Sequence, residues 1–323
     1  MTTHAITANK SYSAISPAPE DGDDISMANG STLTIDVTTK KLGSDSAGAW
    51  GIINANNGET NNIVITSSGV LRLNSGVSLL VSYNSGLTST FTGEAGGAIE
   101  YYGSYANQIR ILNGEDAHGE WTLGSNGGAP FTISNLGSGQ LTFGNSQGRD
   151  KVTAYNLEFT GDIVSHLGRG VAIDGFDLDE DCGTVNIYGN RLAGTDDFSI
   201  KNMRHRSTGT CFDLSSVTAP SSTQKRDMVG IICDGPVNFD VCGFIVWDNF
   251  YWPSMGAAGT GAKGSFKNGW LDPNTLIGFY PNYVHDCLVN NTDLSNPHDF
   301  GGVAAQDIHG CVFVCTGQIS QDN

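Results

Sequence analysis

Short runs of alternating hydrophobic and polar residues, separated by glycine-bearing turns, recur along most of this chain. The clearest example is the segment 63–81, whose turns contain Gly69 and Gly76. Its strand-like runs are residues 63–65, 71–73 and 77–81. A period-2 alternation predicts strands, and strands joined by corners this tight predict one turn of a parallel β-helix.

From about residue 130 the pattern changes to an apolar residue, a polar or small pair, and then an alternating apolar strand. It occurs at 133–136, 154–159, 173–178, 200–203, 241–246, 284–289 and 308–313. Leu157 and Phe176 are 19 residues apart, and Phe176 and Met203 are 27 apart. Strands that repeat at such intervals can stack in parallel about 4.8 Å apart. We therefore predict an all-β parallel β-helix, with a β-sandwich or jelly roll as the alternative.

The composition divides the predicted solenoid into three parts. Residues 1–30 are polar and include an acidic run at 20–24, so we expect an N-terminal arm or a cap over the first coil. Residues 31–150 are expected to form regular coils. Residues 151–323 are expected to form coils with loop insertions and a C-terminal cap.

Glycine supplies 43 of the 323 residues, which suits a fold with many corners. The net charge is −17, and an acidic surface repels phosphate backbones, so we predict no nucleic-acid partner. The longest apolar runs are too short to span a membrane, so none is predicted. The first residues, Met1–Ala5, lack the pattern of a signal peptide, so we expect synthesis in a cytoplasm.

The cysteines all lie in the second half of the chain. They are Cys182, Cys211, Cys233, Cys242, Cys287, Cys311 and Cys315. Cys211 and Cys233 are 22 residues apart, about one coil, which predicts small thiols stacked in the core. A zinc site at His309, Cys311 and Cys315 is the alternative, but the spacing matches no familiar ligand pair. We predict no metal and no cofactor.

Clustered carboxylates are the first candidate for chemistry. Asp177, Asp179 and Asp181 alternate, so an extended strand would place them on one side. Enzymes built on β-helices use such groups to bind calcium or to flank a glycosidic bond. In so acidic a chain, a charged corner explains the same residues.

A basic segment is the second candidate. If it is extended, Arg204 and Arg206 lie on one face and His205 on the other. Lyase chemistry needs a base and cations that stabilise an enolate. Salt bridges to the acidic neighbouring coil explain the arginines equally well.

Aromatic residues form the third candidate, as contacts for a protein partner or for sugar rings. Tyr251, Trp252 and Trp270 are the residues concerned. Because Trp252 precedes Pro253, we expect it on a loop as an exposed anchor. We favour a protein interface over sugar binding.

The coil pattern, as in residues 283–291, resembles the right-handed parallel β-helices of tailed-bacteriophage virion proteins. That group includes tailspikes, polysaccharide depolymerases and capsid-decorating proteins, and the pattern is also similar to that of pectate-lyase-like enzymes. The resemblance covers residues 31–315 and is one of architecture, without a diagnostic catalytic motif. It implies a right-handed solenoid and a homotrimer of parallel rods. Family tailspikes are usually much longer, with extra domains at both ends, so we expect a short decorating protein.

The sequence thus predicts a structural protein of a phage virion surface, a homotrimeric capsid decoration or cement protein rather than an enzyme. A tailspike or tail-fibre subunit is the nearer variant. A polysaccharide depolymerase, either a lyase or a glycoside hydrolase, is the alternative. The expected partners are further copies of the chain, major capsid or tail proteins, and a surface polysaccharide.

Overall fold

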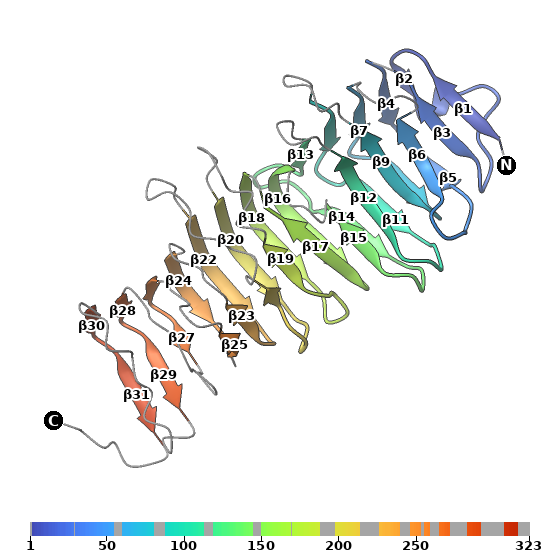
Figure 1. Cartoon of the computed structure of the whole chain (residues 1–323). Helices are drawn as coiled ribbons and strands as arrows, with labels where there is room; N and C mark the ends of the chain where they lie inside the picture. The colour runs from blue at the N-terminus through green and yellow to red at the C-terminus, as the bar shows by residue number, and fades with distance from the viewer. Residues whose placement is uncertain are drawn as a thin grey trace.

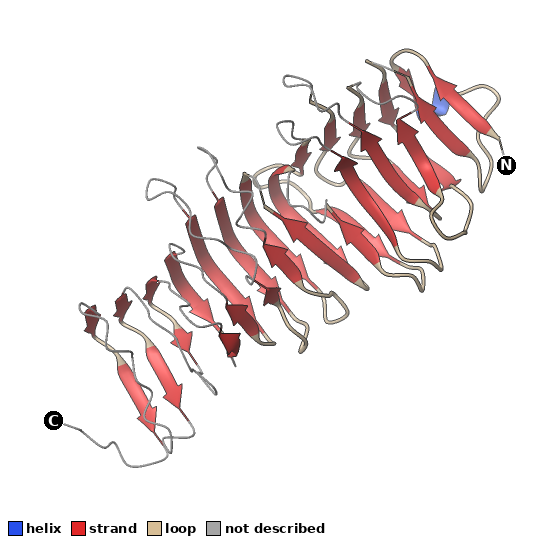
Figure 2. Ribbon diagram, viewed as in Figure 1, coloured by secondary structure: helices blue, strands red, loops and turns tan. Residues whose placement is uncertain are grey.

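The structure, a computed structural model, is an elongated stack of strands with the two termini at opposite ends (Figure 1). It describes residues 2–28, 30–54, 60–80, 88–112, 119–144, 150–168, 170–187, 198–213, 226–239, 246–252, 255–258, 265–271, 283–291 and 307–315. The described residues are almost entirely strands and turns (Figure 2), with one short 3₁₀ helix, η1 (Tyr12–Ala14). None of their helices is long and apolar enough to cross a membrane.

Within the described residues the first sheet has 11 strands, and each strand pairs with the strand of the next coil, meaning the next passage of the chain around the stack. In order they are β1 (Thr3–Ile6), β3 (Asp24–Met27), β6 (Trp50–Asn54), β9 (Gly76–Leu80), β12 (Asn107–Leu112), β15 (Leu141–Phe143), β17 (Ile163–Leu167), β19 (Val185–Ile187), β21 (Phe212–Asp213), β23 (Val237–Phe239) and β25 (Met255–Ala258).

The second sheet has 20 strands within the described part of the chain. Its first ladder is β2 (Lys10–Ser11), β4 (Thr32–Ile35), β7 (Asn62–Ile65), β10 (Thr90–Gly93) and β13 (Glu120–Leu123), and its second is β5 (Thr38–Leu42), β8 (Val70–Leu73), β11 (Ala98–Tyr101) and β14 (Phe131–Asn135). Both ladders continue in the long strands β16 (Lys151–Thr160), β18 (Val171–Leu178), β20 (Phe198–His205), β22 (Arg226–Cys233) and β24 (Val246–Tyr251). They separate again as β26 (Ser265–Lys267), β28 (Tyr283–His285) and β30 (Asp307–His309), and as β27 (Trp270–Leu271), β29 (Leu288–Asn291) and β31 (Val312–Cys315).

Strand pairing confirms the all-β prediction and the long parallel sheets. All strand pairs among the described residues are parallel, from β1 with β3 at one end to β29 with β31 at the other. A jelly roll or a typical sandwich is built from antiparallel strands. That alternative is therefore wrong for the described residues, and the arrangement is compatible with a solenoid.

The segment 63–81 forms β7, β8 and β9, as its alternation predicts. Its inward residues are fully buried: Ile63, Ile65, Leu71, Leu73, Val77 and Leu79. The coil is longer than this segment, however, because Ile63 pairs with Phe91 of the next coil. The chain between β9 and β10 completes the turn, and residues 81–87 of it lie outside the described residues.

The N-terminal arm is a wrong prediction. Residues 3–27 begin the stack itself: β1 and β2 belong to its first coil and pair with β3 and β4 of the second. Ile6, Ile15 and Ile25 are buried in the common core. The segment is polar because only alternate residues of a strand need to be apolar, so its polarity does not distinguish an arm from a coil.

The two ladders of the second sheet join at β16 through a single residue in the left-handed region. The first half of β16 pairs with β13 and the second half with β14, and Asn156 between them has φ 50°. The same bend recurs in each following coil and stacks in register. The bend residues are Asn156, Gly175, Asn202, Gly230, Asn249, Asn268, Asp286 and Gly310, all with positive φ. Glycine, asparagine and aspartate are the residues that tolerate this conformation best.

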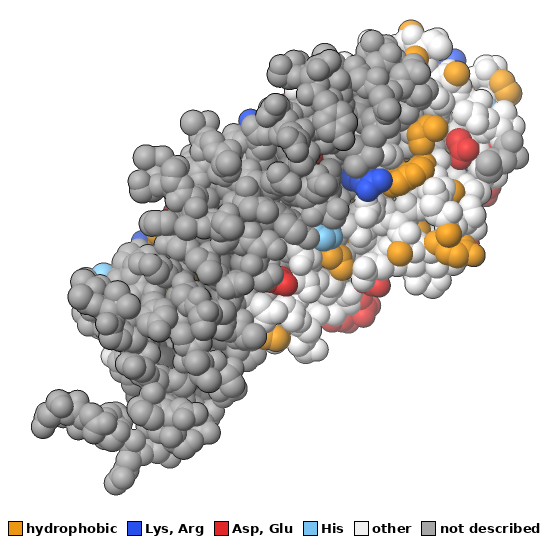
Figure 3. Space-filling view, in the orientation of Figure 1, with side chains coloured by type: hydrophobic (Ala, Val, Ile, Leu, Met, Phe, Trp, Pro, Cys, Tyr) orange, Lys and Arg blue, Asp and Glu red, His pale blue; other side chains and the backbone are white. Residues whose placement is uncertain are grey.

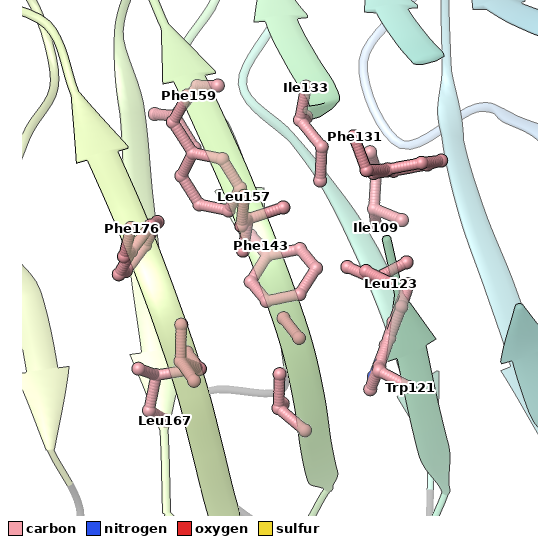
Figure 4. Close-up of a cluster of buried hydrophobic side chains, with 14 of the residues drawn as sticks. Ile109, Trp121, Leu123, Phe131, Ile133, Phe143, Leu157, Phe159, Leu167 and Phe176 are labelled. Carbon is pink, nitrogen blue, oxygen red and sulfur yellow. The ribbon is translucent and has the colours of Figure 1, made fainter. Parts of the chain in front are cut away.

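The core is one continuous cluster of buried side chains along the stack. A column of aromatic rings runs through its centre (Figure 4): Trp121 contacts Phe143 at 5.0 Å, and Phe143 contacts Phe159 at 5.3 Å between ring centroids. Phe159 then contacts Phe176 at 5.0 Å, with the rings nearly perpendicular. These geometries are the favourable ones for aromatic pairs, so the column ties successive coils together.

Candidate functional site

The candidate site is a groove that runs along the stacked bends on the outer surface. It consists of two adjoining hollows of about 440 and about 410 Å³, which share Asn202 and Arg204. Asp177 lines the first hollow and Tyr251 the second. Since β16, β18, β20, β22 and β24 lie side by side in Figure 1, the groove crosses these coils along the axis of the stack.

The amides of the bend residues give the groove a polar floor. The Nδ2 atom of Asn202 donates to Oδ1 of Asp174 at 2.7 Å, on the neighbouring coil. Further along, Nδ2 of Asn268 donates to Oδ1 of Asp248 at 2.9 Å. Each of these two asparagines therefore links its bend to a carboxylate of the previous coil.

Bends also decide which side chains reach the groove. A left-handed residue inserts one extra outward position into the alternation, so the inward residues before and after the bend are three positions apart instead of two. Ile173 and Phe176 are both buried around Gly175, and Asp177 then faces outward. Without the bend, straight alternation from Ile173 would bury Asp177.

Charged side chains at the groove pair across three coils. Asp177 Oδ1 lies 2.6 Å from Nη1 of Arg206, and Arg204 Nη2 lies 3.1 Å from Oδ2 of Asp234. The hydrogen bond to Asp177 raises the pKa of Arg206. The predicted salt bridge to the acidic neighbouring coil is present for Arg206, whereas Arg204 pairs with Asp234 of the following coil. Two diagonal ion pairs fix the outer surface here and cancel its charge locally.

The acidic cluster does not line one side of a strand. β18 ends at Leu178, and Asp179 and Asp181 lie in the turn that follows it. The Oδ1 atom of Asp179 accepts hydrogen bonds from the backbone N–H groups of Asp181 and Cys182, both at 3.1 Å. Its Oδ2 atom accepts from the N–H of Gly161 at 2.8 Å. Asp179 therefore holds a corner, and only Asp177 of the expected alternating set reaches the groove.

His205 faces the interior, as predicted from alternation with Arg204 and Arg206. It is fully buried, its Nδ1 accepts from the N–H of Ser207 at 3.3 Å, and its Nε2 lies 3.0 Å from the carbonyl oxygen of Gly183. Accepting at Nδ1 places the ring proton on Nε2, which donates to Gly183. His205 is thus a structural residue and cannot reach the groove as a base.

The thiols of the described core are buried, as predicted for Cys182, Cys211, Cys233 and Cys287, and Cys311 is half-buried. Cys211 and Cys233 contact each other beside His205. Hydrogen bonds with Cys233 and His205 lower the pKa of Cys211, whereas burial raises the pKa of Cys233. Burial also raises the pKa of Cys287, to about 11. Cys242 and the side chains of His309 and Cys315 lie outside the described residues. The zinc site that was the alternative for His309, Cys311 and Cys315 therefore stays a prediction. In the described part of the chain, His, Cys, Asp and Glu side chains form no group that could hold a metal ion.

Among the aromatic candidates, Trp252 is a wrong prediction. It is fully buried, with its ring 4.4 Å from Trp247 and 4.5 Å from Phe250. The bend at Asn249 reverses the alternation, so Phe250 and Trp252 turn inward and Tyr251 turns outward. Tyr251 is 40% exposed and its ring lies 5.6 Å from that of half-buried Trp270.

Sequence reasoning missed the bend residues and Ile232, which lines the second hollow. A signal for the bends is present, because the polar or small pair in the second repeat ends on the bend residue at 156, 175 and 202. Two further bends, at Gly230 in β22 and Asn249 in β24, lie outside the sequence repeats, and the repeat at 241–246 overlaps β24 at Val246 alone.

On the face drawn in Figure 3, hydrophobic side chains form small separate groups among uncharged polar atoms. Comparisons with protein families, with curated proteins and with solved structures found no match. The function is therefore argued from the geometry of this chain.

Proposed function

We propose that this chain is a right-handed parallel β-helix and a structural protein of a phage virion surface, most specifically a homotrimeric capsid decoration or cement protein. The observation that carries the proposal is the parallel pairing of successive coils in both sheets, over a single continuous core. Each interior coil is hydrogen-bonded on both sides, which makes a stiff rod that can be presented or laid on a particle.

The charged groups of the groove support a structural role. Asp177 and Arg204 are engaged in ion pairs with Arg206 and Asp234, and Asp179 is engaged in a turn. A catalytic acid, base or cation must be able to approach a substrate atom. Here the same groups hold neighbouring coils together. A tailspike or tail-fibre subunit would use the same rod and is the nearer variant of the proposal.

One observation favours a second candidate, a polysaccharide lyase or glycoside hydrolase. The groove is open to solvent and combines carboxylates of Glu158 and Asp177 with Arg204 and, at its far end, the ring of Tyr251. Carboxylates and an aromatic ring along a groove suit a sugar chain. The ion pairs would then have to open when substrate binds.

Two assays on the phage that encodes this chain test the proposal. Immunogold labelling of purified particles should place the chain on the capsid shell, whereas label at the tail tip would select the spike variant. In parallel, purified protein should leave bacterial capsular and lipopolysaccharide preparations uncut. Release of reducing or unsaturated sugar ends that is lost in Asp177→Asn would overturn the structural proposal in favour of the enzyme.

A further inference from the structure

A row of apolar side chains lies on the outer surface of the second half of the stack. We call it the apolar stripe, and its members are Ile232, Tyr251, Trp270, Leu288 and Val312. Ile232 pairs with Tyr251 and Tyr251 with Trp270, while Trp270 pairs with Leu288 and Leu288 with Val312. The stripe thus contributes one residue from each of successive coils and spans about 19 Å at the usual strand spacing.

These side chains face outward. Ile232 is 38% exposed, Tyr251 40% and Val312 59%. By contrast, the residues that directly precede stripe members in the sequence are buried at Ile231, Phe250 and Cys287. Trp270 and Leu288 are half-buried, and Trp270 packs edge-on against Tyr251. The exposed faces of the two aromatic residues therefore lie at the middle of the stripe.

The fold itself does not require apolar residues in this row. The same row in the four preceding coils consists of Thr132, Glu158, Asp177 and Arg204, which pair in the same parallel register. The backbone positions are equivalent, yet the side chains change from charged to apolar at Ile232 and stay apolar to Val312. Contiguous exposed apolar groups are uncommon unless a partner covers them.

We propose that the apolar stripe is covered by the same stripe of further copies of this chain, so that three parallel rods meet along their stripes. This rests on the proposed homotrimer and names the surface that forms it. A straight row with one residue per strand matches an identical row, because both share the spacing of the stack. Irregular protein surfaces lack that spacing.

Charge also favours a second copy at this face. The chain carries a net charge of −17, so copies repel each other unless the approaching surfaces are locally neutral. Beside the stripe, Asp234 is paired with Arg204, and Asp248 is paired with Lys267 at 3.0 Å. Such pairs let two copies approach along the stripe.

The stripe has the layout of an interface centre with a polar border. Tyr251 and Trp270 supply large rings of the kind that dominate binding energy. Asn249, Asn268 and Asp286 lie exposed in the adjoining bends and can form the polar rim. A stable interface buries roughly 800 Å² per partner, so the stripe is its apolar centre and the bends complete it.

The test compares two tyrosines of similar exposure. Tyr251→Arg places a charge on the stripe, and Tyr155→Arg places one on an outward residue that is 37% exposed but lies off it. Sedimentation of the full chain should show an oligomer that Tyr251→Arg weakens at least about tenfold in dissociation constant. Tyr155→Arg should leave association unchanged, and circular dichroism should show both variants folded.

Cross-linking gives a readout that does not depend on weakened association. Ile232→Cys treated with a short bismaleimide should yield covalent dimers above the background that the natural cysteines give, and Tyr155→Cys should not. An oligomer that both Tyr→Arg variants leave intact, without Ile232→Cys cross-links, would overturn the stripe while leaving the structural function standing. A wild-type chain that stays monomeric at high concentration would overturn the homotrimer as well. Monomers on the capsid shell would still support decoration.

Discussion

Replacing one bend glycine tests the claim that the stacked left-handed bends determine the fold of the second half. Gly175 has φ 82°, and a Cβ atom built there would lie 2.7 Å from Oδ1 of Asn156 and 3.2 Å from its backbone N. Gly22 has φ 88° but open space around the same position. Gly175→Ala therefore combines backbone strain with a clash, and Gly22→Ala has the strain alone.

The expected costs follow from these two contributions. An L-residue in the left-handed region costs about 1–2 kcal/mol, and alanine recovers about 0.4–1 kcal/mol by restricting the unfolded chain. Gly22→Ala should therefore lower the free energy of unfolding by about 1 kcal/mol. At Gly175 the side chain of Asn156 must also move and give up its 3.0 Å hydrogen bond to the carbonyl of Gly128. With overpacking of about 1–3 kcal/mol added, the total should be about 2–4 kcal/mol.

Urea unfolding followed by far-UV circular dichroism measures both variants against the wild-type chain. Asn156→Gly in the Gly175→Ala background removes the clash and should recover about 1–2 kcal/mol, as a double-mutant cycle reveals. The reasoning would be refuted if Gly175→Ala cost no more than Gly22→Ala. It would also be refuted if Asn156→Gly gave no recovery.

Three further perturbations probe the core, the first coil and the groove. Phe159→Ala removes a ring that contacts Phe143 at 5.3 Å and Phe176 at 5.0 Å, so urea unfolding should show a loss of about 3–5 kcal/mol; a loss below about 1 kcal/mol would contradict the aromatic column. Hydrogen bonds from His4 and from the backbone of Thr2 and Glu20 lower the pKa of Asp23 to about 2 from an ordinary 3.8, so its stabilisation is present above pH 4 and disappears as the pH falls through 2. Asp23→Asn should reduce the melting temperature at pH 7 and flatten the decline between pH 4 and pH 2, and an unchanged pH profile would count against this pair. Arg206→Ala breaks an ion pair whose side chains are 40% and 45% exposed, so its cost should stay within about 1 kcal/mol and shrink in high salt; a larger, salt-independent loss would mean that Arg206 holds the fold in another way.

Alternation predicted the strands well wherever a coil is straight. Ile63, Leu71 and Val77 all face the core, because a strand places every second side chain on one side and only that side must be apolar. The same rule failed for residues 1–30, whose polar appearance came from their outward positions. Short strands such as β1 and β3 carry too few apolar residues to stand out from a polar segment.

The site was predicted less well, because one residue in the left-handed region reverses the alternation after it. Trp252 was expected outside and is buried, while Tyr251 is exposed, because Asn249 lies between them and Trp247. Asp179 was expected beside Asp177 but lies beyond the end of β18. Asparagine and glycine are also common in ordinary turns, so their identity alone does not reveal a bend inside a strand. Each bend stacks on the bend of the next coil, and the number of residues between two such bends varies with loop length. The spacing along the chain therefore does not reveal them either.

The central claim, that this chain reinforces the surface of a virus particle, is tested most directly by removing it and adding it back. Particles of the encoding phage made without the chain should release their genome at a lower temperature than complete particles, as followed by a DNA-binding dye. Purified chain added to them should restore the higher release temperature, and chain carrying Tyr251→Arg should restore it less well at equal concentration. Identical release temperatures with and without the chain, together with no binding of the purified chain to the particles, would contradict the account.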